Sequence, residues 1–242
     1  VHFQETYSPT PNICVFRILL AYAVQHNLDL KQMDVHTAFL IPELPKHEVI
    51  YMRVPPGLYP FLKECGITVK EGQSLRLNKC IYGLKQASKY WNKKLVAVLT
   101  KFGFKQIPDE PCLFVKEGSG STPPVFILIW VDDLLMAGST KALKVISKLL
   151  GKALPMKDLG FPSLFTGVAI EKTKKGIFLT QKVFTQKSLD LFGMSDCKGL
   201  PTPTSGERLT KEGAPTLDPK IPYRSAVGVL LWLARNTRPD IS

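Results

Sequence analysis

Two adjacent carboxylates between apolar arms constrain the fold of this chain more than any other feature. The first arm runs from Phe126 to Val131, the acids are Asp132 and Asp133, and the second arm runs from Leu134 to Gly138. Arms that are apolar on both faces predict strands covered on both sides. We therefore expect a β-hairpin over residues 125–136, with its acidic turn at the end of a covered sheet.

The acidic turn is a candidate metal site. Adjacent carboxylates repel each other, and burial raises the free energy of the charged pair unless a cation is present. Because the ligands are oxygens without His or Cys nearby, the ion expected is Mg²⁺ or Mn²⁺. The alternative is a structural turn, since Asp is a common turn residue.

Asp34 strengthens the metal interpretation. It is a lone acid between Met33 and Val35, inside a strand predicted over residues 28–40. If that strand lies beside the hairpin, three carboxylates can hold two metal ions ~3.5–4 Å apart, the arrangement of in-line phosphoryl transfer. The alternative is a structural Asp that is satisfied by hydrogen bonds.

The remaining patterns predict a mixed α+β fold, in which an antiparallel sheet is backed by helices on one face. Thr10 is the expected cap of the first helix, and Gly103 the expected end of the second. A second, smaller unit is expected to begin near residue 160. Predicted helices are 11–25, 88–102, 139–150, 183–192 and 223–235; further strands are 49–54, 74–77, 168–172 and 177–180; a surface loop is expected at 57–73 and a Pro/Gly/Thr-rich linker at 199–222.

The charge of the chain points to a polyanionic partner. Its 32 Lys and Arg against 20 Asp and Glu give a net charge of +12, which is typical of nucleic-acid-binding proteins and also occurs in basic proteins of other kinds. Five widely spaced cysteines and no secretory signal favour an intracellular protein. No apolar run approaches the ~20 residues of a membrane span, so no membrane partner is expected. The two ends indicate a piece of a longer protein.

Several sequence blocks together resemble one family. In order they are Gln32–Leu40, Val49–Gly57, Leu77–Ala87 followed by Trp91, Trp130–Leu135, Tyr223–Gly228 and Thr237–Ile241. Each is similar to a motif of the reverse transcriptase of copia-type LTR retrotransposons, and their order is also that of the family. The resemblance covers nearly the whole chain.

This resemblance implies an RNA-directed DNA polymerase with a right-hand palm, partial fingers and a small thumb-like C-terminal part. It places partial fingers and palm in residues 1–160. Residues 161–242 would hold the end of the palm and a thumb-like segment leading to an RNase H domain outside this chain. The implied partners are an RNA or DNA primer–template, deoxynucleoside triphosphates and the protease, integrase and RNase H of a Pol polyprotein. The implied location is the cytoplasm, in virus-like particles, or the nucleus.

The resemblance also implies roles for individual residues. Catalysis and binding of two Mg²⁺ or Mn²⁺ ions would fall to Asp34, Asp132 and Asp133, with the carbonyl of Val35 as a further metal ligand. Phe39 would be the steric gate against a 2′-hydroxyl, with core packing as its alternative. The other implied contacts are Gln86 to the incoming nucleotide, and Lys85, Lys89, Lys93, Lys94, Trp130 and Gly167 to the template–primer. The alternative for Gln86 is a solvated polar residue beside a helix start, and the alternative for the four lysines is a solvated helix face.

The sequence departs from the family pattern in three places. Ile41-Pro42 replaces the usual Asn-Gly, Ser88-Lys89 replaces a Pro-Arg type of pair, and Trp130 replaces a tyrosine. These departures keep open a non-catalytic remnant that binds nucleic acid through backbone phosphates. A metal-dependent phosphohydrolase that shares only the acidic hairpin is a third hypothesis, and it would make the ordered blocks coincidental.

Overall fold

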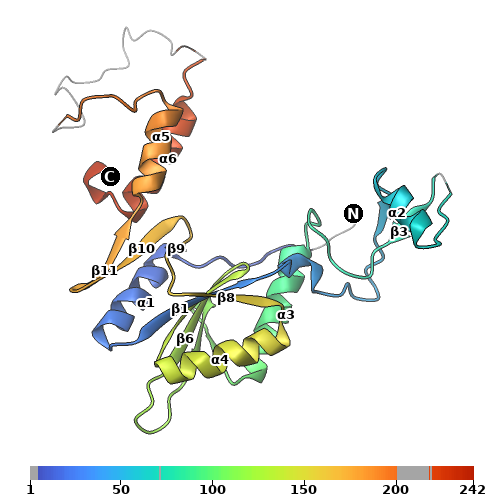
Figure 1. The fold of residues 1–242 in the computed structure, drawn as a ribbon, viewed down its shortest axis with the longest axis horizontal. Helices are drawn as coiled ribbons and strands as arrows, with labels where there is room; N and C mark the ends of the chain where they lie inside the picture. The colour runs from blue at the N-terminus through green and yellow to red at the C-terminus, as the bar shows by residue number, and fades with distance from the viewer. Residues whose placement is uncertain (1–4, 71, 201–217, 219) are drawn as a thin grey trace. The chain divides into compact units, whose positions relative to one another are not determined.

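The computed structural model describes residues 5–70, 72–200, 218 and 220–242. The chain divides into two compact units, Val1–Phe161 and Pro162–Ser242 (Figure 1). Each unit has its own sheet. The expected mixture of helices and antiparallel sheet is confirmed.

A six-stranded sheet organises the first unit. Its strand order is β4-β5-β6-β7-β1-β8, and each neighbouring pair is antiparallel. The predicted hairpin is confirmed as β6 and β7 and lies inside the sheet, which explains why both of its arms are apolar. The strands are β1 Asp29–Val35, β4 Lys105–Ile107, β5 Glu110–Lys116, β6 Val125–Trp130, β7 Asp133–Gly138 and β8 Met156–Gly160.

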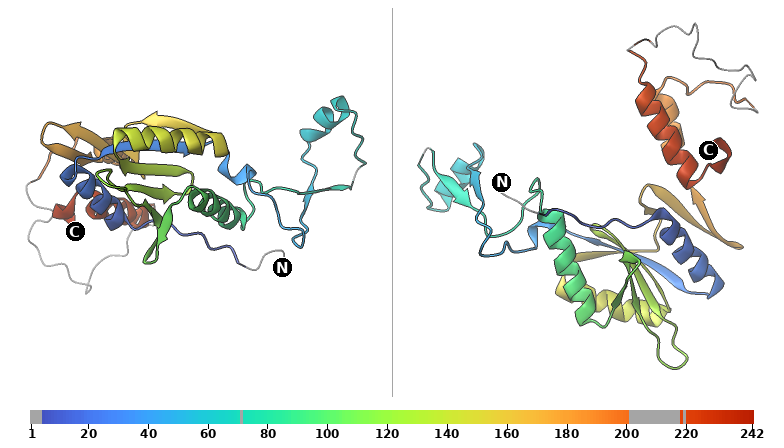
Figure 2. Two further views of the ribbon diagram at one scale, coloured as in Figure 1. Left: turned by 90° about the horizontal axis from the view of Figure 1, so that it is seen from below. Right: turned by 180° about the vertical axis from the view of Figure 1, so that it is seen from behind.

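Helices cover this sheet on both faces, so the expectation of helices on one face is wrong (Figure 2, right). Ile127 and Leu134 alternate with residues of the opposite face and join a core cluster with side chains of α3 (Ala87–Lys101) and α4 (Thr140–Ala153). On the opposite face, Tyr22 of α1 (Ile13–Gln25) meets Phe126 edge to face at 5.2 Å. An apolar hairpin needs cover on both sides, because its side chains point alternately to each face.

The helices begin and end where local chemistry dictates. The side chain of Ser139 accepts a hydrogen bond from the backbone N–H of Ala142 and caps α4. Gly103 follows α3 with φ +84°, as predicted for its end. At α1 the cap is Asn12, which accepts from the backbone of Cys14, and not Thr10 as predicted. Both residue types can cap a helix, and the sequence offered both within three positions.

The strand that carries Asp34 is shorter than predicted. It ends at Val35, because Thr37 adopts a left-handed conformation and a 3-10 turn, Ala38–Leu40, follows. Asp34 therefore lies next to the last residue of β1, and not in the middle of a strand. The correction brings the carboxylate to the end of the sheet.

The segment after this turn forms a small two-stranded sheet. Strand β2 (Tyr51–Arg53) pairs with β3 (Ser74–Arg76). The connection between them contains the helix α2 (Leu58–Glu64), where the sequence predicted only a surface loop. Because α2 buries none of its residues, its apolar side chains give no clear helical pattern in the sequence.

The second unit contains a three-stranded sheet of order β11-β10-β9. The predicted hairpin is confirmed, as are the two helices that follow it. The predicted linker at 199–222 falls largely on residues 201–217 and 219, outside the described part. In the described residues no helix is long and apolar enough to cross a membrane. The elements are β9 Leu164–Phe165, β10 Val168–Thr173, β11 Gly176–Thr180, α5 Lys182–Leu191, α6 Tyr223–Asn236 and a 3-10 turn, Pro239–Ile241.

The core of the first unit should be sensitive to truncation at α3. Leu95 is fully buried there, so we expect Leu95→Ala to lower the free energy of unfolding by about 2–5 kcal/mol. Urea unfolding measures this loss, provided that the dependence of the unfolding free energy on urea concentration is the same for both proteins. Thr100→Ala, an exposed position of the same helix, should change it by less than ~0.5 kcal/mol. Equal effects at both positions would contradict the assigned core.

Candidate active site

A tight turn presents the two adjacent acids. Trp130 and Asp133 are paired across the hairpin, so Val131 and Asp132 alone connect β6 to β7. Val131 has φ +57°, a conformation that β-branched residues rarely adopt. A positive φ at the first of two turn residues suits the right-handed twist of a hairpin, where glycine is usual. Strain of this kind persists only when surrounding contacts hold it.

Two hydrogen bonds hold the strained turn. The indole N–H of Trp91, a buried side chain of α3, donates to the carbonyl of Val131 at 2.6 Å. The carbonyl of Asp132 accepts from the backbone N–H of Val35 at 3.0 Å. The turn is thus attached to a helix on one side and to β1 on the other. The hydrogen bond to Val131 gives a structural role to Trp91, which follows the Leu77–Ala87 block in the sequence.

Strand register places Asp34 beside the acidic turn. Asp34 is paired with Asp133 across β1 and β7, so their side chains leave the same face of the sheet. Trp130 of β6 continues this row on one side and Lys157 of β8 on the other. The neighbouring Met33 and Leu134 belong to the core beneath α3 and α4. The acidic row therefore lies on the face opposite those two helices.

The surroundings of Asp133 disfavour its charged form. Its pKa is raised above the ordinary value, chiefly by burial and further by the charges of Asp34 and Asp132. The amide of buried Gln32 donates to its Oδ1 at 3.1 Å and works in the opposite direction. The unfavourable charge of three neighbouring acids is therefore only partly offset by protein groups.

The chemistry of this row fits a divalent cation, although the carboxylates do not converge. In the described part of the chain, no three His, Cys, Asp or Glu side chains are gathered closely enough to hold a metal ion. The donors are all oxygens, the type that Mg²⁺ and Mn²⁺ prefer. The raised pKa of Asp133 is the property that a bound cation would reverse.

The two predicted nucleotide contacts have defined partners. Phe39 lies in the 3-10 turn directly after β1, packs against the core and meets the ring of Tyr82 edge to face at 5.3 Å. Gln86 is 3% exposed, and its amide donates to Glu48 at 3.2 Å. The hydroxyl of Tyr90 donates to the same carboxylate. Gln86 is therefore a buried, hydrogen-bonded residue and not the solvated one that was its alternative.

The predicted template–primer residues fall into separate environments. Lys89 forms an ion pair with Glu5 at 2.8 Å, whereas Lys93 and Lys94 are exposed on α3. Lys85 is also exposed, just before that helix. Gly167, between β9 and β10, has φ +79° and belongs to the second unit. Trp130 is the member of this group that adjoins the acids within the sheet.

Sequence reasoning missed two polar neighbours of the acids. Lys157 lies on β8, a strand that went unpredicted because Met156–Gly160 lacks an alternating apolar pattern. Gln32 was included in a motif block but received no role. Its position two residues before Asp34 is the signal that could have placed it on the same face of a strand.

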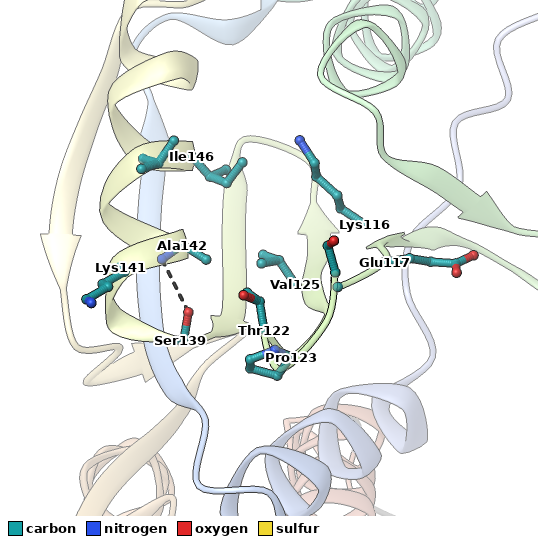
Figure 3. A pocket seen from close by; sticks show the side chains of 12 residues that line it. Lys116, Glu117, Thr122, Pro123, Val125, Ser139, Lys141, Ala142 and Ile146 are labelled. Atoms are coloured by element: carbon teal, nitrogen blue, oxygen red, sulfur yellow. Dashed lines mark hydrogen bonds between the residues drawn. The ribbon is translucent and has the colours of Figure 1, made fainter.

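A cavity in the described part of the chain lies elsewhere. Its volume is about 380 Å³, and it lies at the N-terminal end of α4, where Val125, Ala142 and Ile146 line it (Figure 3). A second cavity, of about 230 Å³, adjoins Glu48 and Arg76. None of the three aspartates lines either cavity.

Two aspartates at the turn of an antiparallel hairpin and a third on the neighbouring strand β1 define a candidate metal-dependent phosphoryl-transfer site. Residues 1–206 match the family model described as reverse transcriptase (RNA-dependent DNA polymerase). The chain belongs to this reverse transcriptase family, whose members are nucleotidyltransferases that generally use divalent metal ions.

Relatives confirm the resemblance to copia-type retrotransposons. A retrovirus-related Pol polyprotein from transposon TNT 1-94 of Nicotiana tabacum is 34% identical in an alignment 254 residues long, which covers 100% of this chain and 18% of that protein. The polyprotein from transposon RE2 of Arabidopsis thaliana is 32% identical, over 99% of this chain and 16% of its own length. A putative transposon Ty5-1 protein of Saccharomyces cerevisiae is 35% identical, over 87% and 66%. The chain thus spans less than a fifth of the two polyproteins.

The raised pKa of Asp133 has a testable consequence for stability in metal-free buffer. The unfolded carboxyl ionises near 3.8 and the folded one at higher pH, so stability falls as pH rises across that window. Asp133→Asn should therefore unfold at a higher temperature than the parent at neutral pH, and the difference should vanish below pH 3.8. Thermal unfolding measured against pH checks this.

Asp158→Asn provides a control of opposite sign. Partial burial raises the pKa of Asp158. Hydrogen bonds from Lys31 and from the backbone of Gly160 together lower it by a larger amount, so the net shift is downward. Its carboxylate stabilises the fold above pH 3.8, and this contribution is lost as pH falls through the lowered pKa. Asp158→Asn should be less stable than the parent at neutral pH. The same sign for both variants would contradict the assigned environments.

Proposed function

We propose that this chain carries the polymerase centre of a copia-type reverse transcriptase. It would add deoxynucleotides to the 3′ end of a primer on an RNA or DNA template. The observation that carries the proposal is the pairing of Asp34 with Asp133 beside the Asp132 turn, in a chain of the reverse transcriptase family. The activity, substrates and partners of the full polyprotein are part of the proposal, because the chain is a fraction of its relatives' length.

Asp34, Asp132 and Asp133 are the proposed ligands of two Mg²⁺ or Mn²⁺ ions, with the carbonyl of Val35 as a further ligand. When bound, such ions lower the pKa of the primer 3′-hydroxyl and neutralise the triphosphate. In the reaction the hydroxyl oxygen attacks the α-phosphorus and pyrophosphate leaves. The protein's own contribution is positional: Gln32 orients Asp133, while Trp91 and the backbone of Val35 hold the turn.

The nucleotide and primer would lie beside the acidic row. Phe39 is the proposed steric gate, and its packing against the core and Tyr82 restricts the ring. Gln86 would act near the incoming nucleotide, supported by Glu48. Trp130 adjoins Asp133 and would contact the primer end. Lys89 forms an ion pair with Glu5. The remaining proposed template–primer contacts are Lys85, Lys89, Lys93, Lys94 and Gly167.

The proposed anatomy follows the family. The six-stranded sheet with α3 and α4 would be the palm, and the segment with β2, α2 and β3 would belong to partial fingers. The second unit would hold the end of the palm and the thumb-like part. The parent would be a Pol polyprotein with protease, integrase and RNase H, working in cytoplasmic virus-like particles or the nucleus. The five cysteines, all free in the structure, are compatible with that reducing location.

Primer extension tests the proposal directly. With poly(rA)–oligo(dT), dTTP and Mg²⁺ or Mn²⁺, we expect extension by the parent chain. Asp132→Asn with Asp133→Asn should lower the rate by about two orders of magnitude or more, because the transition-state charge loses its stabilisation. Asp109→Asn with Asp196→Asn removes two exposed carboxylates elsewhere and should leave the rate unchanged.

Equal rates in both double variants would contradict the assigned centre. A second measurement is independent of turnover, since a bound ion stabilises the folded state. Mn²⁺ should raise the unfolding temperature of the parent and of the Asp109→Asn, Asp196→Asn variant. It should have no such effect on the Asp132→Asn, Asp133→Asn variant.

A non-catalytic nucleic-acid-binding remnant is the second candidate function. The observation that favours it is that the acids do not converge in the described part of the chain. Such a remnant would bind duplex with strong salt dependence but neither extend a primer nor be stabilised by Mn²⁺. The extension and metal measurements together separate it from the polymerase.

Phe39 gives a test of substrate choice. Phe39→Ala should increase the ratio of ribonucleotide to deoxyribonucleotide incorporation by at least about tenfold, because the smaller side chain leaves room for a 2′-hydroxyl. Competing rGTP and dGTP on a defined template gives this ratio. Tyr82→Ala, which removes the ring's neighbour but not the ring, should have a smaller effect. An unchanged ratio in Phe39→Ala would leave Phe39 as a core residue.

A further inference from the structure

The outer face of α4 carries an uninterrupted basic stripe. Lys141, Lys144, Lys148 and Lys152 recur at spacings of three, four and four residues, so they share one side of the helix. All four are exposed, as are Val145 and Leu149 between them. At 1.5 Å per residue the stripe, hereafter the α4 lysine stripe, is about 16 Å long.

No acidic group balances this stripe. Helix α4 contains neither Asp nor Glu, and in the described part of the chain none of the four lysines forms an ion pair. Neighbouring like charges at these spacings destabilise a helix. Lys141 and Lys144 also lie near the N-terminal end, where the helix dipole disfavours positive charge. The arrangement therefore opposes helix stability, and a polyanionic partner would explain it.

The α4 lysine stripe faces away from the acidic row. Leu143, Ile146 and Leu150 bury the inner side of α4 in the core, and the helix packs on β7, β1 and β8. Asp34 and Asp133 leave the other face of those strands. A sheet and a helix, each about 10 Å thick, therefore separate the stripe from a primer–template at the acids. One short duplex cannot contact both.

The chemistry of the stripe selects its occupant. Four cations over this length match a strand of duplex, which places about five phosphates in the same axial distance. Helix α4 has no aromatic side chain on which an unpaired base could stack, and stacking is the usual basis of single-strand binding. Contacts from lysine alone favour backbone phosphates over base edges.

We propose that the α4 lysine stripe is a second nucleic-acid site, which binds the phosphate backbone of a duplex segment distinct from the primer–template at the aspartates. The site is independent of sequence and of catalysis. It would allow one chain to hold two stretches of duplex, one on each face of the central sheet.

Replacement of all four lysines by Gln tests the proposal, since Gln keeps helix propensity and removes charge. Stoichiometric titration with a 12-base-pair blunt duplex at low salt should give two duplexes per chain for the parent and one for the variant. For the variant, a plot of the logarithm of the association constant against the logarithm of the salt concentration should also be less steep than for the parent. The slope should be smaller in magnitude by about 3 to 4. Primer extension at saturating primer–template should be unchanged.

A matched control removes the same charge without the stripe. Lys63, Lys101, Lys174 and Lys187 are exposed and scattered over the chain, and their replacement by Gln should keep two duplexes and nearly the parent's salt dependence. The pairs Lys141→Gln, Lys144→Gln and Lys148→Gln, Lys152→Gln should each lose about half of the slope. These pairs also serve if the fourfold variant unfolds.

Three outcomes would overturn the proposal. They are one duplex per parent chain, equal slopes in the stripe and scattered variants, or a stripe effect on single strands or acidic peptides but not on duplex. Failure of extension with the duplex result intact would instead overturn the polymerase proposal alone. The Asp132→Asn, Asp133→Asn variant should accordingly keep its stripe-dependent binding.

Discussion

The antiparallel pairing of β1 with β7 is the constraint on which the rest of the first unit depends. It brings Asp34, about a hundred residues earlier in the chain, next to Asp133, and it sends Met33 and Leu134 to the opposite face. The same register lets Val35 donate to the carbonyl of Asp132 and Gln32 reach the carboxyl of Asp133. One pattern of backbone hydrogen bonds thus separates an acidic surface from an apolar core.

The surrounding protein holds the acidic turn in an energetically unfavourable backbone conformation and charge state. The left-handed Val131 is a strained residue for the tip of a hairpin, and burial raises the pKa of Asp133. Trp91 and Gln32 offset part of these effects through single hydrogen bonds. Strain and charge repulsion at one turn are typical of sites whose structure is completed by a ligand. The core packed on both faces of the sheet offsets the unfavourable free energy of this turn.

Sequence reasoning recovered the elements with strong periodic patterns and the residues with unusual chemistry. The β6–β7 hairpin was predicted from its two apolar arms, α3 from apolar residues at helical spacing, and α4 from the capping residues Ser139-Thr140 at its start. Strands β4, β5, β8 and β9 and helix α2 were missed. Met156–Gly160 of β8 is mostly polar, and α2 buries nothing. The pairing of Asp34 with Asp133 could be suggested by the sequence but not dictated by it, since register is a property of two segments. The packing of α1 on the second face of the sheet was missed because it, too, depends on two segments that are far apart in the sequence.

The two-residue period of β1 should also constrain which deletions copies of such a gene tolerate. Loss of one codon between Leu30 and Asp34 would shift one part of the strand by one position against β7, so that either the carboxylate or the apolar residues turn to the wrong face. Loss of two adjacent codons keeps the alternation and is the milder lesion. Degenerate copies that still fold should therefore have lost residues from this strand in pairs, and odd deletions should be confined to the loops.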